Sequence, residues 1–123
     1  MGIVVKKFGG SSVSNTERIE FLAEKLVRER RVDEQVVIVV SAMGKTTDKL
    51  FSLAHQICEK PYQRELDMLA TAGERISMSL LSIALHKYGA SAISFTGSQS
   101  GIITNNNHGN ADIINVNAFR IRE

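Results

Sequence analysis

Apolar residues along the chain form short β-branched runs and stripes at helical spacing, and the two patterns alternate. Residues 3–8 and 36–40 are typical of strands, and the second run is apolar on both faces, as a central parallel strand is. Between them, apolar residues at helical spacing predict a helix from Asn15 or Thr16 to Arg31, with Ser14 or Asn15 as its cap.

The same reading continues through the middle of the chain. A helix is predicted from Thr47 or Asp48 to Ile57, in a segment that Pro61 ends. Residues 66–71 look helical, Gly73 is expected to interrupt them, and a second helix is predicted over 74–88. Gly89 stands where a helix stop is expected.

The last third has shorter elements. A third strand is predicted over 90–95, followed by a loop at 97–101, a turn-rich polar tract at 105–110 and a fourth or edge strand at 113–116. Residues 119–123 read as the start of a helix, so we expect the chain to be a fragment. Strands that alternate with helices predict an α/β fold with a parallel sheet. Ligands bind beyond the carboxyl ends of such strands, here after Phe8, Val40 and Phe95.

Composition narrows the class of protein. The chain has 123 residues, enough for one domain, and its formal net charge of +2 argues against a nucleic-acid binder. No signal peptide and no apolar run long enough to cross a membrane are recognised, and a cytoplasmic location is expected. The single cysteine, Cys58, rules out an intrachain disulfide and a cysteine zinc cage, and is interpreted as a buried structural thiol.

The first strand ends in a stretch that suits phosphate, Lys7-Phe8-Gly9-Gly10-Ser11-Ser12. Glycines let the backbone approach a ligand closely, a turn into a helix presents free N–H groups, and Lys7 adds a positive charge. The order of residues is not that of the Walker loop, in which the lysine follows the glycines. A plain turn with a strand-end lysine is the alternative.

The second break repeats this logic. Ser41-Ala42-Met43-Gly44-Lys45-Thr46-Thr47-Asp48 again places hydroxyls, a glycine and a helix start after a buried strand. The alternative is a simple capped helix, with Thr47 or Asp48 as the cap.

Four motifs taken together resemble one family. They are Lys7-Phe8-Gly9-Gly10-Ser11-Ser12-Val13, Val40-Ser41-Ala42-Met43-Gly44 with Thr46-Thr47-Asp48-Lys49-Leu50, Asp67-Met68-Leu69 with Thr71-Ala72-Gly73-Glu74-Arg75, and Ser94-Phe95-Thr96-Gly97-Ser98-Gln99-Ser100-Gly101. The residues of these motifs, their order and their spacing resemble those of the N-terminal part of the bacterial aspartate kinases. Some relatives have Thr in place of Ser11, and many have Ser-Thr-Gly-Glu in place of Thr71-Ala72-Gly73-Glu74.

The resemblance implies the amino-acid kinase fold (carbamate kinase-like), an α/β/α sandwich with a mainly parallel sheet. It implies transfer of the γ-phosphoryl group of ATP, with Mg²⁺, to the side-chain carboxylate of L-aspartate. Residues 1–123 would be the N-terminal part of the kinase domain, inactive alone, and the enzyme a homo-oligomer or associated with its regulatory part. By the same resemblance, the ATP phosphates would be bound by Lys7, Phe8, Gly9, Gly10 and Ser11, with Lys7 catalytic. Aspartate would be bound by Ser41, Thr47 and Glu74.

Several alternatives stay open at this level. Glu74 has a second interpretation as a favourable charge in the first turn of its helix. Asp67 would order a neighbouring loop or cap a turn, and His108 is interpreted as a surface histidine with no metal partner. Met43 and Met68 are predicted to be packing residues. One alternative is a kinase of the same fold that acts on glutamate, carbamate, acetylglutamate or uridylate. Another is a non-catalytic role for this chain in assembly, through unpaired edges of its sheet.

Overall fold

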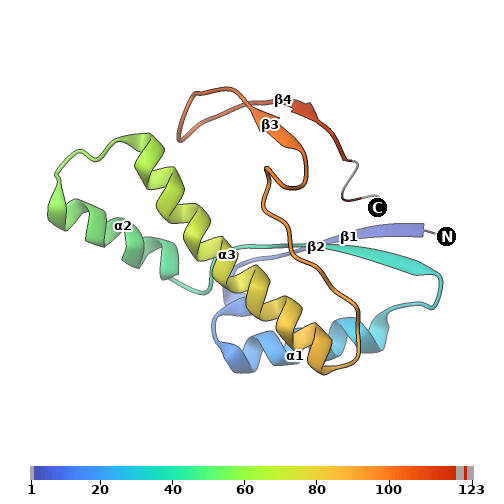
Figure 1. Cartoon of the computed structure of the whole chain (residues 1–123). Helices are drawn as coiled ribbons and strands as arrows, with labels where there is room; N and C mark the ends of the chain where they lie inside the picture. Colours follow the sequence, from blue (N-terminus) through green and yellow to red (C-terminus); the bar gives the residue numbers. More distant parts are fainter. Residues whose placement is uncertain (1, 119–120, 122–123) are drawn as a thin grey trace.

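The computed structural model describes residues 2–118 and 121. Two strands, β1 (Gly2–Phe8) and β2 (Glu34–Val40), pair in parallel, with register running from Gly2 opposite Glu34 to Phe8 opposite Val40 (Figure 1). The short 3₁₀ helix η1 (Gly10–Val13) and the helix α1 (Thr16–Glu29) connect them. Both predicted strands and their parallel pairing are confirmed. Within the described residues β2 pairs with β1 alone.

Helix α1 forms for the reasons read from its sequence. The side chain of Asn15 accepts a hydrogen bond from the backbone N–H of Arg18 at 2.8 Å, so Asn15 is the cap and Ser14 is not. The apolar stripe is buried, as residues at helical spacing on one face should be, and consists of Ile19, Leu22, Ala23 and Leu26. The helix ends at Glu29, two residues before the predicted end.

Two helices follow β2: α2 (Thr46–Ile57) and α3 (Gln63–Lys87). The predicted break at Gly73 is wrong, because α3 runs through it without interruption. Gly73 is buried, and a Cβ atom there would lie 3.2 Å from the Cβ of Ala42 and 3.5 Å from the Cγ2 of Thr46. The glycine is therefore a point of close approach between α3 and the loop after β2, and this packing outweighs its poor helix propensity.

Substituting Gly73 by valine is expected to lower the free energy of unfolding of the full-length gene product by about 1–3 kcal/mol, because the new methyl groups overpack a closed contact. The matched control is Ala72→Val, at an exposed neighbour in the same helix. Helix propensity alone predicts the opposite order, since valine is a better helix former than glycine and a worse one than alanine. Urea unfolding measures both variants, and a larger loss at Ala72 would contradict the close packing at Gly73.

Helix α3 stops where predicted. Gly89 adopts a positive φ of 89°, and the N–H groups of Gly89 and Ala90 donate to the carbonyls of His86 and Leu85. This is the left-handed cap that glycine favours. The predicted strand over 90–95 is wrong, because no strand is assigned to these residues. A strand needs a ladder partner, whereas here the carbonyl of Ala92 lies 2.7 Å from the Nε2 atom of His86.

The predicted strand at 113–116 is confirmed as β4 (Ile113–Val116), and it pairs with a strand that was not predicted, β3 (Ile102–Thr104). The pair is antiparallel and forms a second sheet, so the sheets of the described residues are one parallel and one antiparallel. The turn-rich tract at 105–110 joins the two strands. The predicted helix start at 119–123 lies outside the described residues, except for Ile121.

Asp67 holds this hairpin turn against α3. Its carboxylate accepts a hydrogen bond from the backbone N–H of Gly109 at 2.9 Å and lies 3.6 Å from the Nδ1 atom of His108. Of the two interpretations of Asp67, the ordering of a neighbouring loop is therefore the one observed. His108 is exposed, as predicted for a surface histidine, and its ring lies beside the carboxylate of Asp67.

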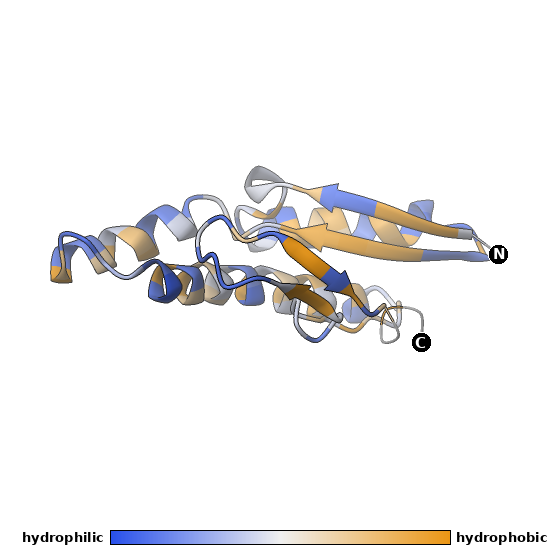
Figure 2. Ribbon diagram, turned by 90° about the horizontal axis from the view of Figure 1, so that it is seen from above, coloured by the Kyte–Doolittle hydropathy of each residue, from blue (hydrophilic) through white to orange (hydrophobic). Residues whose placement is uncertain are grey.

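The hydrophobic core lies between one face of the β1–β2 sheet and the helices α1 and α3. Val13 and the buried residues of both helices meet the partly buried Phe8, Ile38 and Val40 there, and Met43 packs against the same cluster as predicted. The opposite face of the sheet is more open, with Ile3 60% and Val5 65% exposed. Figure 2 shows the hydrophobic character of both strands.

At the surface, Lys87 of α3 pairs with Glu20 of α1, and this hydrogen bond raises the pKa of Lys87.

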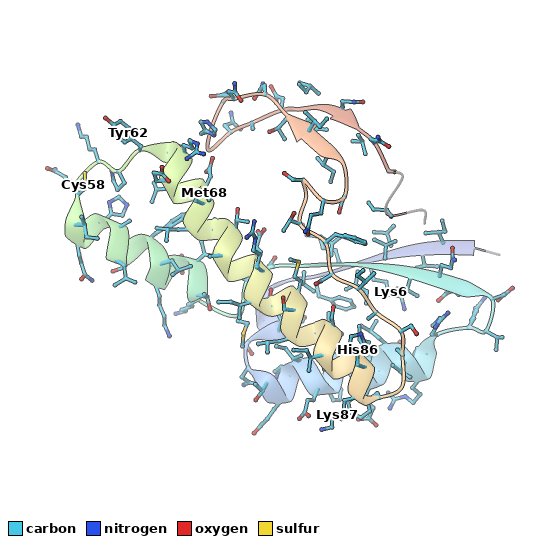
Figure 3. All side chains as sticks on the ribbon, viewed as in Figure 1. Lys6, Cys58, Tyr62, Met68, His86 and Lys87 are labelled. Atoms are coloured by element: carbon cyan, nitrogen blue, oxygen red, sulfur yellow. The ribbon has the colours of Figure 1, made fainter. Side chains whose placement is uncertain are left out.

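Two predictions of burial are wrong. Cys58 is exposed, and Met68 is 56% exposed. Figure 3 shows both, with Tyr62, toward the end of the α2–α3 pair that points away from the β1–β2 sheet. The core does not reach this end, so apolar residue types there stay at the surface.

Because α3 is continuous, it is long and apolar enough by length and composition to cross a membrane, contrary to the sequence expectation. Core helices of globular proteins can have the same length and apolar composition. In α3, 28% of the apolar window is buried, and its C-terminal residues Leu81, Ala84 and Leu85 pack into the core with α1. We therefore interpret α3 as part of the fold.

Candidate functional site

Two loops follow the carboxyl ends of β1 and β2, and the structure joins them. The backbone N–H of Ser41 donates to the carbonyl of Phe8 at 3.2 Å, and that of Gly44 donates to the carbonyl of Gly10 at 3.0 Å. These contacts follow from the parallel pairing of β1 and β2, because the ends of parallel strands meet at one edge of the sheet. Two of the three predicted breaks therefore form one site.

Gly10 is tightly packed at this junction. A Cβ atom on Gly10 would lie 3.0 Å from the carbonyl oxygens of both Ala42 and Gly44, so the second loop would have to shift by a few tenths of an ångström to admit a side chain. Gly9 has no such neighbour: its added Cβ would meet nothing within 4 Å. The two adjacent glycines thus differ, the first open to its surroundings and the second packed against the other loop.

The remaining residues of the first loop lie as follows. Lys7 is exposed, and its ammonium makes no hydrogen bond or ion pair within the described residues. Phe8 packs its ring against the core, and its carbonyl accepts the hydrogen bond from the N–H of Ser41. Ser11 is exposed in η1. The short η1 lies between Gly9 and α1, and α1 begins at Thr16 after its Asn15 cap, as predicted.

The second loop carries the predicted aspartate-binding hydroxyls. Ser41 is half-buried directly after β2, and Thr47 is half-buried in the first turn of α2. The alternative in which Thr47 or Asp48 caps the helix is wrong: the N-cap position is Lys45, and no side chain caps this end of α2. The hydroxyl of Thr47 is therefore not used as a cap.

Glu74 lies in the middle of α3, more than two turns beyond its first residue, Gln63. The interpretation of Glu74 as a first-turn charge is therefore wrong, because the macrodipole acts only near the helix ends. Glu74 is exposed, and its carboxylate makes no hydrogen bond or ion pair with any described residue. The charge is thus free to meet a cation from outside this part of the chain.

One buried hydroxyl connects Glu74 with the second loop. Ser77 is 0% exposed, and its Oγ lies 2.6 Å from the carbonyl oxygen of Ser41 and 3.0 Å from that of Glu74. Sequence reasoning missed Ser77. The available signal was a serine on the face of α3 that also carries Gly73 and Leu81, where an apolar residue is expected.

The third predicted break is not brought to this site by any described contact. In the loop at 97–101, the side chains of Thr96 and Gln99 each bond the backbone N–H of the other. The carbonyl of Gly101 accepts from the N–H of Asn117, just after β4. The loop therefore belongs to the hairpin of β3 and β4.

The described residues provide no cage for a metal ion, since no three His, Cys, Asp or Glu side chains gather among them. They offer instead loop amides and hydroxyls where the two loops meet, Lys7 at the end of β1, and Glu74 next to Gly73, which packs on the second loop. This set suits an anionic ligand at the first loop and a ligand with both an amine and carboxylates at the second.

Comparison with known proteins gives the family. Residues 2–123 match the model of the amino acid kinase family. The chain is 55% identical over 122 residues to a protein named aspartokinase from Mycobacterium bovis, and 52% identical over 122 residues to one from Geobacillus stearothermophilus. These matches cover 99% of this chain but 29% and 30% of the relatives. The chain thus spans under a third of the length of these curated relatives.

A solved structure agrees with this assignment. The crystal structure of aspartate kinase from Synechocystis superposes with a TM-score of 0.77 at 49% sequence identity, over 81% of this chain and 17% of that chain. The expected α/β class with a parallel sheet is therefore confirmed. With its parallel β1–β2 pair, its two joined loops and a family match over nearly its whole length, the chain belongs to the amino acid kinase family.

Proposed function

We propose that the protein of which this chain is part transfers the γ-phosphoryl group of ATP to the side-chain carboxylate of L-aspartate, giving 4-phospho-L-aspartate. This reaction is the first step toward lysine, threonine and methionine. The observation that carries the proposal is the junction of the two strand-end loops, with Glu74 tied to the second of them through Ser77. Relatives that share half of the residues are named aspartokinase, which supports aspartate as the acceptor.

The first loop supplies the charge that phosphoryl transfer needs. A carboxylate acceptor is already ionised at neutral pH, so the site requires no general base, and catalysis consists of positioning and charge stabilisation. Lys7 has no partner within the described residues and can neutralise the negative charge that develops on the phosphoryl oxygens. The amides of Gly9 and Gly10, together with the backbone of Phe8 and the hydroxyl of Ser11, would hold the phosphates.

The second loop and α3 would hold the amino acid. The carboxylate of Glu74 is suited to the ammonium group of aspartate through a charge-assisted hydrogen bond. Ser41 and Thr47 are suited to donate hydroxyl hydrogen bonds to the substrate carboxylates. Because the two loops are bonded to each other, a phosphoryl group on the first loop and an acceptor on the second would lie close together.

The remaining expectations are parts of the same proposal. Mg²⁺ would enter with the ATP phosphates, which fits the way proteins commonly bind it. Residues 1–123 would form the N-terminal part of the kinase domain, and residues outside this sequence would supply the other nucleotide contacts. We also propose a cytoplasmic enzyme that assembles as a homo-oligomer or with its regulatory part.

The test is an ATP-dependent assay of the full-length gene product with aspartate or glutamate as acceptor. We expect ADP release with aspartate, and hydroxylamine should trap the acyl phosphate as a hydroxamate. Glutamate is the matched control, because it differs by one methylene and carries the same charges. Faster turnover with glutamate, or ADP release without a trapped acyl phosphate, would overturn the assignment of aspartate as the acceptor.

A further inference from the structure

We propose that Ser77 is a positioning residue that sets the affinity for the amino-acid substrate by holding Ser41 and Glu74 in one fixed arrangement. The inference rests on the proposed function, and it adds a residue for which the motifs assign no role. Ser77 has no access to solvent or ligand, so it acts through its two neighbours.

The burial of Ser77 requires an explanation. Ser77 and Val13 are the largest side chains described as fully buried, and the other buried members of α3 are Gly73, Leu81, Ala84 and Leu85. A hydroxyl costs free energy at such a place unless it is hydrogen-bonded. Its shorter contact is to the carbonyl of Ser41, 36 positions away in the sequence, at 2.6 Å. The hydroxyl is thus used for a tertiary contact.

This contact fixes the loop after β2. Within the described residues, the Ser41 carbonyl accepts one hydrogen bond, and the donor is the hydroxyl of Ser77. Because the peptide unit is planar, holding this oxygen also fixes the plane of the Ser41–Ala42 peptide. The orientation of the Ser41 side chain then follows from a backbone held on both sides, by Phe8 at its N–H and by Ser77 at its carbonyl.

A second contact acts one helical turn earlier. Gly73 packs against the Cβ of Ala42, and positions 73 and 77 lie on the same face of α3. Glu74 lies between these two contacts, and its own carbonyl is 3.0 Å from the Ser77 hydroxyl. The backbone of the helix segment that carries Glu74 is therefore held to the loop that carries Ser41, by Ser77 together with Gly73.

The experiment measures kcat and both KM values for Ser77→Ala in the full-length gene product. Loss of a buried hydrogen bond leaves the Ser41 carbonyl unsatisfied, and we expect KM for aspartate to rise about 5–30-fold. KM for ATP should change much less, because both contacts of Ser77 are to the second loop and α3. The matched control is Ser79→Ala, at an exposed serine of the same helix, which should leave all three constants unchanged.

A second measurement does not depend on catalysis. Amide hydrogen exchange of residues 41–44 should become faster in Ser77→Ala and stay as in the wild type in Ser79→Ala. If Ser77→Ala does not fold, Ser77→Cys fills the site with a slightly larger side chain and a weaker donor, and KM for aspartate should again rise more than KM for ATP.

Two outcomes would overturn the role of Ser77: an unchanged KM for aspartate, or equal changes in both KM values, as a general loosening of the fold would give. Failure of the wild type to use aspartate would instead overturn the proposed function. The exchange of residues 41–44 would still show whether Ser77 holds the loop.

Discussion

Replacing Lys7 with alanine is expected to lower kcat for aspartate phosphorylation about 10²–10³-fold in the full-length gene product. Lys7 stands at the end of β1, exposed and with no partner among the described residues, so its charge serves no contact within this part of the fold. Its loss removes a positive charge from the transferring phosphoryl group. Because the side chain is exposed, thermal stability should change little.

The matched control for Lys7 is its neighbour Lys6. Successive residues of a strand point to opposite faces, so Lys6 lies on the half-buried side of β1, near the core (Figure 3). Lys6→Ala should keep most of kcat, since its ammonium would not reach the same ligand. Equal losses of kcat in the two variants, or none at Lys7, would support the alternative of a strand-end lysine without a catalytic role.

Replacing Glu74 with glutamine is expected to raise KM for aspartate about 10–150-fold, with a smaller effect on kcat. A charge-assisted hydrogen bond to the substrate ammonium is worth about 1.5–3 kcal/mol, and glutamine keeps the shape of the side chain without its charge. KM for ATP should not change. Steady-state kinetics with each substrate varied in turn separates these effects.

Glu65→Gln is the matched control for Glu74, because Glu65 is exposed in the first turn of the same helix, where a negative charge suits the macrodipole. Its kinetic constants should equal those of the wild type. The reverse pattern, with stability lost and KM unchanged at Glu74, would show that the carboxylate serves the helix and not the substrate.

Several elements of the fold could be read from local sequence. The β-branched runs became β1 and β2, Asn15 caps α1, and Gly89 ends α3, because each of these features depends on residues close in the chain. The residues of the two strand-end loops were also recognisable, since glycines, hydroxyls and a lysine after a strand point to an anion site.

Features that depend on distant partners could not be read this way. The run at 90–95 has the composition of a strand but is not assigned as one, and Cys58 and Met68 have apolar character but lie where the core does not reach. Gly73 looks like a helix breaker, and only its contact with Ala42 shows why a continuous helix needs a glycine there.

At the candidate site, the groups available to a ligand could be recognised from the amino-acid sequence, including the two loops and the acid at Glu74. Their arrangement could not: the bonds between the loops at Phe8 and Gly10, the mid-helix place of Glu74 and the contact of Ser77 with Ser41 appear only in the folded chain. Residue types fix local conformation and chemistry, whereas hydrogen bonds between segments 36 positions apart exist only once the chain has packed.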